Sequence, residues 1–185
     1  MKKFLIAGFV LLLTSFTCFA QDHSSAPPAN KPSATTPADT WVTLTPELGR
    51  FSILFPEQAK DQSQTTDSAH GPYTTHLFLA KTTKGVFLVG WVDYDPDFNF
   101  GVQSELEANR DNFVKGVNAT LINSSKITFQ GYPGLEFTAE TESTVFKSRV
   151  YIIGRRPYQM IAGTNKGQED DYNVSRFLTS FRLKP

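Results

Sequence analysis

The stretch VFLVGWVDY at residues 86–94 decides the fold class of this chain. Side chains of a strand alternate between two faces, and here both faces receive apolar residues: Val86, Leu88 and Val92 on one, and Phe87, Val89 and Trp91 on the other. A strand that is apolar on both faces belongs in the middle of a sheet that is covered by other layers. The sequence therefore predicts a central sheet packed on both sides.

Six further stretches show the same period of two, or a short apolar run between turn residues. They are residues 51–55, 73–80, 121–129, 135–141, 145–153 and 158–162. Short turns at 131–134 and 154–157 join several of them, and consecutive strands joined in this way pair antiparallel. The predicted class is α+β, with a central antiparallel sheet of about six or seven strands and helices packed on its faces.

Two segments have a helical period instead. Between residues 102 and 117 the apolar residues recur at spacings of four, seven and four: Val102, Leu106, Phe113 and Val117. This pattern predicts an amphipathic helix that follows Asn99 as its N-cap, with Glu105 among its polar residues. A second helix is expected at about 168–178, because acids at its start suit the positive end of the helix dipole.

The N-terminus has the pattern of an export signal, with lysines at positions 2 and 3, an apolar run at 4–13 and small and polar residues up to Ala20. The apolar run is too short to span a bilayer, and Ala20 suits the last position before cleavage. We expect residues 1–20 to be a cleaved signal peptide. The mature protein would then begin at Gln21 and work in the periplasm or outside the cell, with no integral membrane segment.

Cys18 offers the alternative of a lipid anchor, but Phe16 is too large for the small-residue pattern of a lipoprotein signal. Residues 21–40 are rich in Pro, Ser, Ala and Thr and contain almost nothing large and apolar. Such a segment cannot bury enough surface to offset the entropy of ordering, so a disordered linker is predicted there. A single domain is expected over 41–185.

Charge and cysteine content narrow the classes of partner. Loss of the two signal lysines leaves 16 basic residues against 18 acidic ones, so there is no electrostatic reason to expect nucleic acid as a partner. Cys18 is the one cysteine and leaves with the signal, so the mature chain has no thiol for a disulfide, a metal or nucleophilic catalysis. The sequence has no glycine-rich phosphate-binding motif and no G-x-S-x-G, and no cofactor is expected.

Trp41 is followed by four segments that are informative together: RFSILFP at 50–56, GYPGLEF at 131–137, RVYIIGRRPYQM at 149–160 and RFLTSFRL at 176–183. In this order they resemble uncharacterised bacterial exported domains of the PsbP and Mog1 group. The resemblance implies an antiparallel sheet with helices on both faces. It also implies an accessory binding role, since PsbP proteins support the oxygen-evolving side of photosystem II and Mog1 proteins bind a Ran-type GTPase.

The acidic stretch DYDPDFN at 93–99 is a candidate for chemistry. Asp93, Asp95 and Asp97 stand at the first, third and fifth positions of a calcium loop, but Phe98 replaces the glycine that the sharp turn needs. A solvated strand-to-helix loop is therefore favoured over an EF-type site, and a looser divalent-metal site stays open. An envelope hydrolase that uses Asp93 and His76 is the enzymatic alternative.

Aromatic residues are numerous, with sixteen Phe, six Tyr and two Trp, and the strand period assigns most of them to the core. Trp41, Tyr132 and Tyr158 fall at the ends of elements, and Arg155 and Arg156 occupy the adjacent turn. Aromatic residues beside arginine are typical of protein interfaces. We therefore expect these five residues to bind a cell-envelope protein, and a non-enzymatic accessory module is the favoured function.

Overall fold

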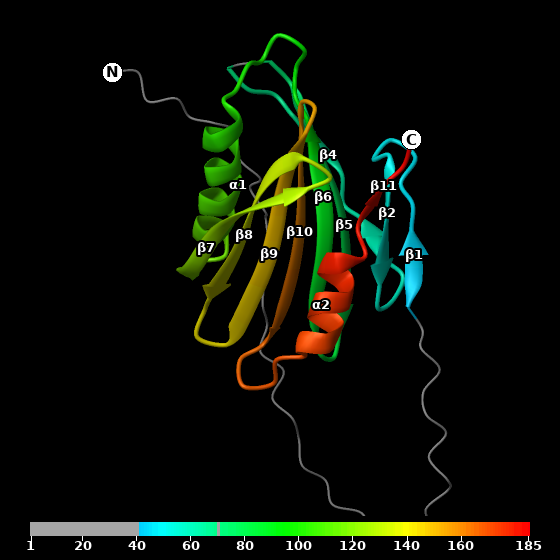
Figure 1. The fold of residues 1–185 in the computed structure, drawn as a ribbon, viewed down its shortest axis with the longest axis vertical. Helices are drawn as coiled ribbons and strands as arrows, with labels where there is room; N and C mark the ends of the chain where they lie inside the picture. Colours follow the sequence, from blue (N-terminus) through cyan, green and yellow to red (C-terminus); the bar gives the residue numbers. More distant parts are fainter. Residues whose placement is uncertain (1–40, 70) are drawn as a thin grey trace, which may run out of the picture.

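The computed structural model describes residues 41–69 and 71–185, which form a sandwich of layers around a long twisted sheet (Figure 1). The predicted signal peptide at 1–20, with Cys18, and the predicted linker at 21–40 lie outside the described residues. Among the described residues, no helix has the length and apolar character needed to cross a membrane.

The larger sheet has eight strands in the order β3-β5-β6-β10-β9-β8-β7, and β4 also pairs with β5. Its strands are β3 (Lys60–Asp61), β4 (Gln64–Thr66), β5 (Tyr73–Thr82), β6 (Gly85–Asp93), β7 (Thr120–Phe129), β8 (Tyr132–Glu140), β9 (Thr144–Ile153) and β10 (Arg156–Asn165). All neighbouring strands run antiparallel. The predicted antiparallel sheet is therefore confirmed.

A second, three-stranded sheet was not anticipated. It consists of β1 (Val42–Leu44), β2 (Phe51–Phe55) and β11 (Arg182–Leu183), with β2 in the middle. Residues 51–55 form a strand, as predicted, but among the described residues this strand pairs with β1 and β11 and sends Phe51, Ile53 and Phe55 into the core beside the large sheet. Strands β3 and β4 were also missed, since their residues are polar and mostly exposed and carry no apolar alternation.

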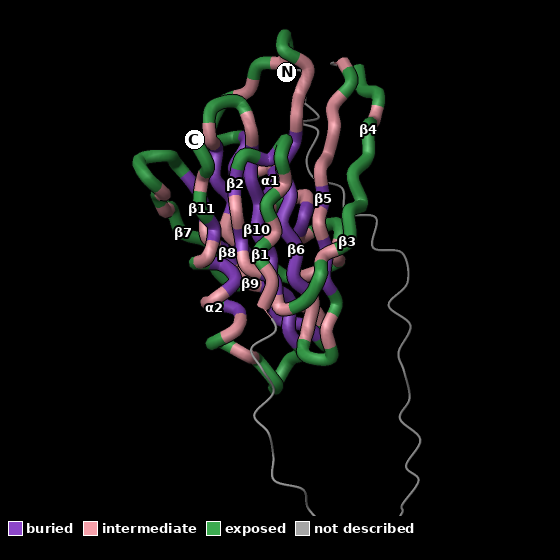
Figure 2. Tube along the Cα trace, turned by 90° about the vertical axis from the view of Figure 1, so that its right-hand side faces the viewer, coloured by how far each residue is buried: buried purple, intermediate pink, exposed green. Residues whose placement is uncertain are grey.

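Strand β6 confirms the prediction that residues 86–92 form a strand buried on both faces. Phe87, Val89 and Trp91 belong to one apolar cluster, whereas Leu88 and Val92 belong to another on the opposite face. Strands β9 and β10 are also buried along most of their length, while exposed positions gather at the outer strands and the loops (Figure 2). The middle of the sheet is thus packed on both sides, as the alternation indicates.

Two helices contribute to these two clusters. Helix α1 (Val102–Gly116) places Phe113 with its ring centroid 5.3 Å from that of Phe146 in β9. Helix α2 (Asp171–Thr179) places Phe177 5.4 Å from Phe87 in β6 and 5.1 Å from Phe55 in β2. The first cluster therefore joins α2 and the small sheet to the large sheet, and the second joins α1 to it.

The start of α1 differs from the prediction. Gly101, not Asn99, is the N-cap, and it makes no side-chain cap hydrogen bond. Val102 is exposed, whereas Glu105 is buried with Leu106. The helix is therefore rotated relative to the predicted apolar stripe, because its buried positions are 105, 106, 109 and 113.

Candidate functional site

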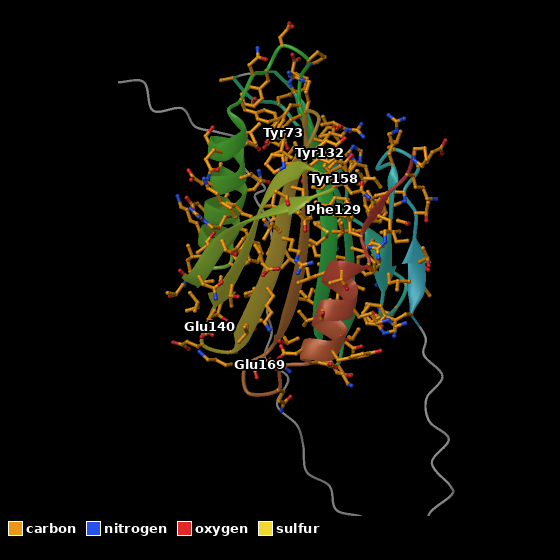
Figure 3. The ribbon with its side chains drawn as sticks, viewed as in Figure 1. Tyr73, Phe129, Tyr132, Glu140, Tyr158 and Glu169 are labelled. Atoms are coloured by element: carbon orange, nitrogen blue, oxygen red, sulfur yellow. The ribbon has the colours of Figure 1, made fainter. Side chains whose placement is uncertain are left out.

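One end of the large sheet gathers most of the predicted site residues. Tyr158 in β10 pairs with Trp91 in β6 and with Tyr151 in β9, and Gly134 in β8 pairs with Tyr151 as well. Two residues closer to this end, the next row contains Tyr132, Ile153, Arg156 and Asp93. We call the surface formed by Leu48, His76, Asp93, Tyr132 and Arg156 the Asp93 rim; Figure 3 shows Tyr132 and Tyr158 near this end of the sheet.

Asp93 is the centre of the rim because three donors converge on its carboxylate. The Nε2 atom of His76 lies 3.2 Å from Oδ2, and the indole Nε1 of Trp91 donates to the same oxygen at 3.2 Å. The Nε atom of Arg156 forms an ion pair with Oδ1. Both carboxylate oxygens are therefore engaged, and the three partners come from strands β5, β6 and β10.

Arg156 also connects the rim to the small sheet. Its Nη1 donates to the carbonyl of Leu48 at 2.8 Å, in the turn between β1 and β2. Partial burial alone would lower the pKa of Arg156, but the hydroxyl of Tyr158 and the carboxylate of Asp93 outweigh it and raise the pKa above its usual value. The guanidinium therefore stays charged and holds the turn against the sheet.

The imidazole of His76 is fixed from two directions. It stacks on the indole of Trp91 with ring centroids 4.3 Å apart and an angle of 9° between the planes. Its Nε2 atom contacts Asp93 at 3.2 Å, and no hydroxyl contact to this atom is seen among the described residues. The geometry therefore orients His76 toward a carboxylate rather than toward a nucleophile.

Arg155 has a different position from its neighbour. Its Nη2 donates to the carbonyl of Pro96 at 3.0 Å and also to those of Asp95 and Phe98, and its Nη1 lies 3.4 Å from the Oδ1 of Asn99. These oxygens belong to the loop between β6 and α1. The guanidinium thus occupies the space between the loop carbonyls, where it fastens the loop to the turn before β10.

The three aspartates proposed for a metal site do not converge. Asp93 is engaged on the rim, while the Oδ1 of Asp95 accepts from the backbone N–H of Asp97 at 2.9 Å in a local turn. Over residues 41–69 and 71–185, no group of three or more His, Cys, Asp or Glu side chains could hold a metal ion. The loop instead uses Asp95 to shape its own backbone.

Three of the five predicted binding residues do not contribute to the rim surface: Arg155, which binds the loop carbonyls, and Tyr158 and Trp41. Tyr158 is only 3% exposed and donates to the carbonyl of Gly49 at 3.2 Å, so its prediction as an exposed group was wrong. Trp41 packs edge-on against Phe87, near the opposite end of β6, with the guanidinium of Arg176 4.6 Å from its ring. The strand period places aromatic residues on a face but does not say what covers that face.

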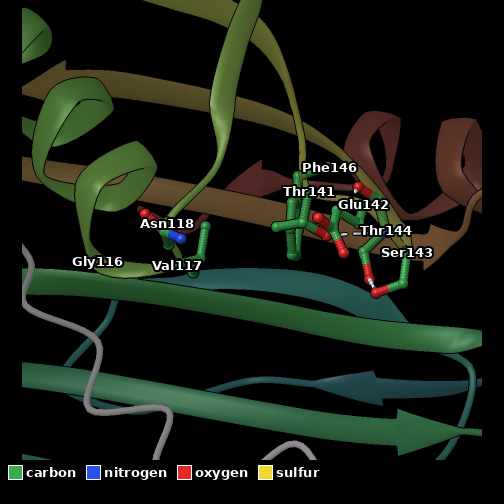
Figure 4. Close-up of a pocket in the computed structure, with 8 residues that line it drawn as sticks. All are labelled: Gly116, Val117, Asn118, Thr141, Glu142, Ser143, Thr144 and Phe146. Atoms are coloured by element: carbon green, nitrogen blue, oxygen red, sulfur yellow. Dashed lines mark hydrogen bonds between the residues drawn. The ribbon is translucent and has the colours of Figure 1, made fainter.

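A pocket lies elsewhere, where the C-terminal end of α1 meets the turn between β8 and β9 (Figure 4). It has a volume of about 520 Å³ and is lined by Gly116, Val117, Asn118, Thr141, Glu142, Ser143, Thr144 and Phe146. The hydroxyl of Thr141 accepts from the backbone N–H of Thr144 at 3.0 Å, so it stabilises the turn itself. Among the described residues that line the pocket, Glu142 is the one charged residue, so they supply no second ionisable group for acid–base chemistry.

A buried polar cluster beneath α1 was also not predicted. Glu105 and Asn109 are almost fully buried, and the Oε1 of Glu105 accepts from the hydroxyl of Tyr94 at 2.5 Å and from the Nδ2 of Asn109 at 2.8 Å. Burial raises the pKa of Glu105 above its ordinary value, although these two hydrogen bonds act in the opposite direction. The spacing of four between residues 105, 109 and 113 was the available signal, but polar residues on a helix are normally assigned to solvent.

The fold of the described chain is PsbP-like. It is similar to the solution structure of cyanobacterial PsbP (CyanoP) from Synechocystis sp. PCC 6803, with a TM-score of 0.51 and 10% sequence identity, over 83% of this chain and 98% of that one. A crystal structure from Bacteroides thetaiotaomicron VPI-5482 is similar with a TM-score of 0.40 and 13% identity, over 80% of this chain and 49% of that one. No protein-family model and no curated protein matches the sequence. At these identities the likeness concerns the fold alone.

Proposed function

We propose that this protein is an exported accessory module of the bacterial cell envelope, which binds another envelope protein through the Asp93 rim and catalyses no reaction. The PsbP-like fold fits an accessory or binding role. The observation that carries the proposal is the composition of the rim. Two exposed apolar side chains, Leu48 at 66% and Tyr132 at 37% exposure, belong to the same surface as the paired charges of Arg156 and Asp93.

This composition suits a binding surface for two reasons. Aromatic residues and arginine are enriched where partners make their strongest contacts. In addition, Arg156 and Asp93 are already paired within the chain, so a partner that covers them would not leave an isolated charge without water. The rim is also held by contacts from Trp91 and Leu48 to these charged groups, so little ordering is needed on binding.

Site-specific photo-crosslinking in living cells tests the proposal. A photoreactive amino acid would replace Tyr132 or Leu48, and Tyr172, which is 74% exposed on α2, serves as the matched control. We expect the two rim positions to give the same discrete protein adduct and position 172 to give none. Equal adducts from all three positions, or adducts from position 172 alone, would show that the rim is not the binding surface.

A separate experiment tests whether the protein is exported and where its signal peptide is cleaved. If the chain is exported and processed after Ala20, the intact mass of the mature protein corresponds to a chain that starts at Gln21. A mass that includes Cys18 with a diacylglyceryl group would establish a membrane-anchored lipoprotein instead.

An envelope hydrolase is the second candidate function, and the 3.2 Å contact between His76 and Asp93 is the observation in its favour. A carboxylate that orients a histidine is part of many hydrolytic sites. Hydrolase activity of the purified protein that disappears in both Asp93→Asn and His76→Ala would establish this function. Activity that is absent, or that survives both changes, would remove it.

A further inference from the structure

The buried polar cluster beneath α1 contains more hydrogen-bond acceptors than donors. Three of its side-chain oxygens are buried and have no hydrogen-bond partner among the described residues: Oε2 of Glu105, Oδ1 of Asn109 and Oε1 of Gln159. All three are acceptors when Glu105 is ionised, so they cannot satisfy one another. Buried acceptors without donors are costly, and native interiors contain few of them.

These groups lie in one layer between the helix and the sheet. Leu106 of α1 shares an apolar cluster with Val150 of β9, and Phe113 packs against Phe146 of the same strand. Ser148 lies between these two strand positions on the same face, and Gln159 of β10 donates to its hydroxyl at 3.3 Å. Asn109 stands midway between Leu106 and Phe113, and therefore above this polar pair.

Among the described residues, no cation faces the cluster from strands β6, β8, β9 and β10. On β9, Lys147 pairs with Asp171 of α2 and Arg149 donates to the carbonyl of Leu178, so both point to the opposite face of the sheet. On β8, Glu136 pairs with Arg149 and Glu140 pairs with Lys166. On β10 and β6, Arg156 pairs with Asp93 on the rim.

Among the described residues, the helix itself and strands β5 and β7 also leave the cluster without a counter-ion. Lys126 of β7 pairs with Leu135 on the α1 side of the sheet but is exposed to solvent. Arg110 of α1 pairs with Asp111 and contacts Ser124, on the outer side of the helix. From β5, the titratable group Tyr73 has its ring centroid 6.3 Å from that of Tyr94. Tyr94 remains a neutral donor, because burial and the neighbouring Glu105 raise its pKa above the usual value.

From this arrangement we infer that Glu105 is a pH-sensitive latch for helix α1. When its carboxyl group carries a proton, Oε2 becomes a donor within a layer of acceptors, while Oε1 still accepts from Tyr94 and Asn109. When the proton leaves, a charge without a counter-ion remains between α1 and the sheet, and this loosens the helix. The protonation state of Glu105 would thus control how tightly α1 packs on the sheet at the apolar cluster that contains Phe113, Phe137 and Phe146.

The direction in which stability changes with pH follows from the difference in the pKa of Glu105 between the folded and the unfolded chain. A carboxyl group whose pKa is raised in the folded state holds more protons there than in the unfolded chain. Its stabilising contribution is complete below the ordinary pKa of 4.5 and is lost as the pH rises through the folded-state value. The helix should therefore be held most firmly in acid and least firmly at neutral and alkaline pH.

The test compares three proteins by urea unfolding and by amide hydrogen exchange between about pH 4 and about pH 9. They are the natural chain, Glu105→Gln, which mimics the protonated side chain, and the matched control Glu107→Gln, which changes an exposed carboxylate on the same helix. We expect the unfolding midpoint of the natural chain to fall with pH relative to Glu105→Gln. The control should follow the natural chain, and α1 amides should be better protected in Glu105→Gln at pH 8.

Parallel curves for the natural chain and Glu105→Gln would overturn the latch. If Glu105→Gln does not fold, titration of the Glu105 carboxyl carbon by NMR in the natural chain decides the question. A midpoint above the ordinary value of 4.5 supports the latch, and a midpoint at or below that value overturns it.

Discussion

The two faces of the large sheet are packed in different ways. The face toward α2 and the small sheet is filled by apolar and aromatic side chains, with Phe51 packed edge-on against Trp91 at 5.6 Å and Phe55 against Phe177 at 5.1 Å. The face toward α1 has two smaller apolar clusters and, beside them, the buried groups Glu105, Asn109 and Gln159. The first face is held mainly by apolar burial, with the ion pairs of Asp93 at its edge, whereas the second buries the carboxyl group of Glu105 inside its layer.

This difference separates the stability of the sandwich from the attachment of helix α1. Aromatic packing fixes the sandwich and the position of the rim, because Trp91 belongs to the core cluster and also contacts His76 and Asp93. The buried polar cluster beneath α1 contributes less to the stability of the domain, but it makes the packing of α1 on the sheet depend on pH. Mutations on the two faces should therefore change the free energy of unfolding by different amounts, and these changes should differ in their dependence on pH.

The largest expected effect is on the aromatic face. Replacing Trp91 by Ala removes a fully buried indole and leaves a cavity, which should lower the free energy of unfolding by about 3–5 kcal/mol. Chemical denaturation measures this loss, and Tyr172→Ala on the surface of α2 is the control, with a change within about 0.5 kcal/mol. A stable Trp91→Ala protein would contradict the dominant role of this face.

On the α1 face, Asn109→Ala should cost less. It removes the Nδ2 donor that contacts the Oε1 of Glu105 at 2.8 Å, and the expected loss is about 1–3 kcal/mol. The loss should grow with pH, because the ionised carboxylate depends more strongly on its donors. Denaturation at acidic and alkaline pH, with the less buried Asn112→Ala as the control, measures this trend, and equal losses at both pH values would contradict it.

A smaller effect is expected at the loop that leads to α1. Arg155→Ala removes the guanidinium that binds the carbonyls of residues 95, 96 and 98, and about 1 kcal/mol of stability should be lost because these contacts are exposed. Hydrogen exchange should rise in residues 95–99 but not in β6. Arg182→Ala is the matched arginine control, and faster exchange throughout the sheet would show that Arg155 stabilises more than this loop.

The smallest expected effect on stability is at the rim. Leu48→Ser and Tyr132→Ser change exposed side chains, so the free energy of unfolding should stay within about 0.5 kcal/mol of the natural chain. If these residues contact a partner, each change should reduce the crosslinked adduct formed from the other position. A strong loss of stability would instead assign Leu48 or Tyr132 to packing.

Much of the fold could be predicted from local patterns. The alternation in residues 86–92 identified a strand buried on both faces, and the turn residues indicated antiparallel pairing. The site was less accessible to prediction. His76, Asp93, Tyr132 and Arg156 were each named as candidates, but nothing in the sequence placed them on one rim, and Tyr158 was expected at the surface although it is buried.

The sequence by itself determined the apolar strands and the two helices, since the period of side chains along a segment depends only on neighbouring residues, whereas the polar strands β3 and β4 carry no such period. Only the tertiary structure decided which strands lie beside one another and what covers each face. The separation of β2 into a second sheet, the convergence of His76 and Arg156 on Asp93, and the burial of Glu105 all depend on residues distant in sequence. Such contacts form when the layers pack together, and no local period encodes them.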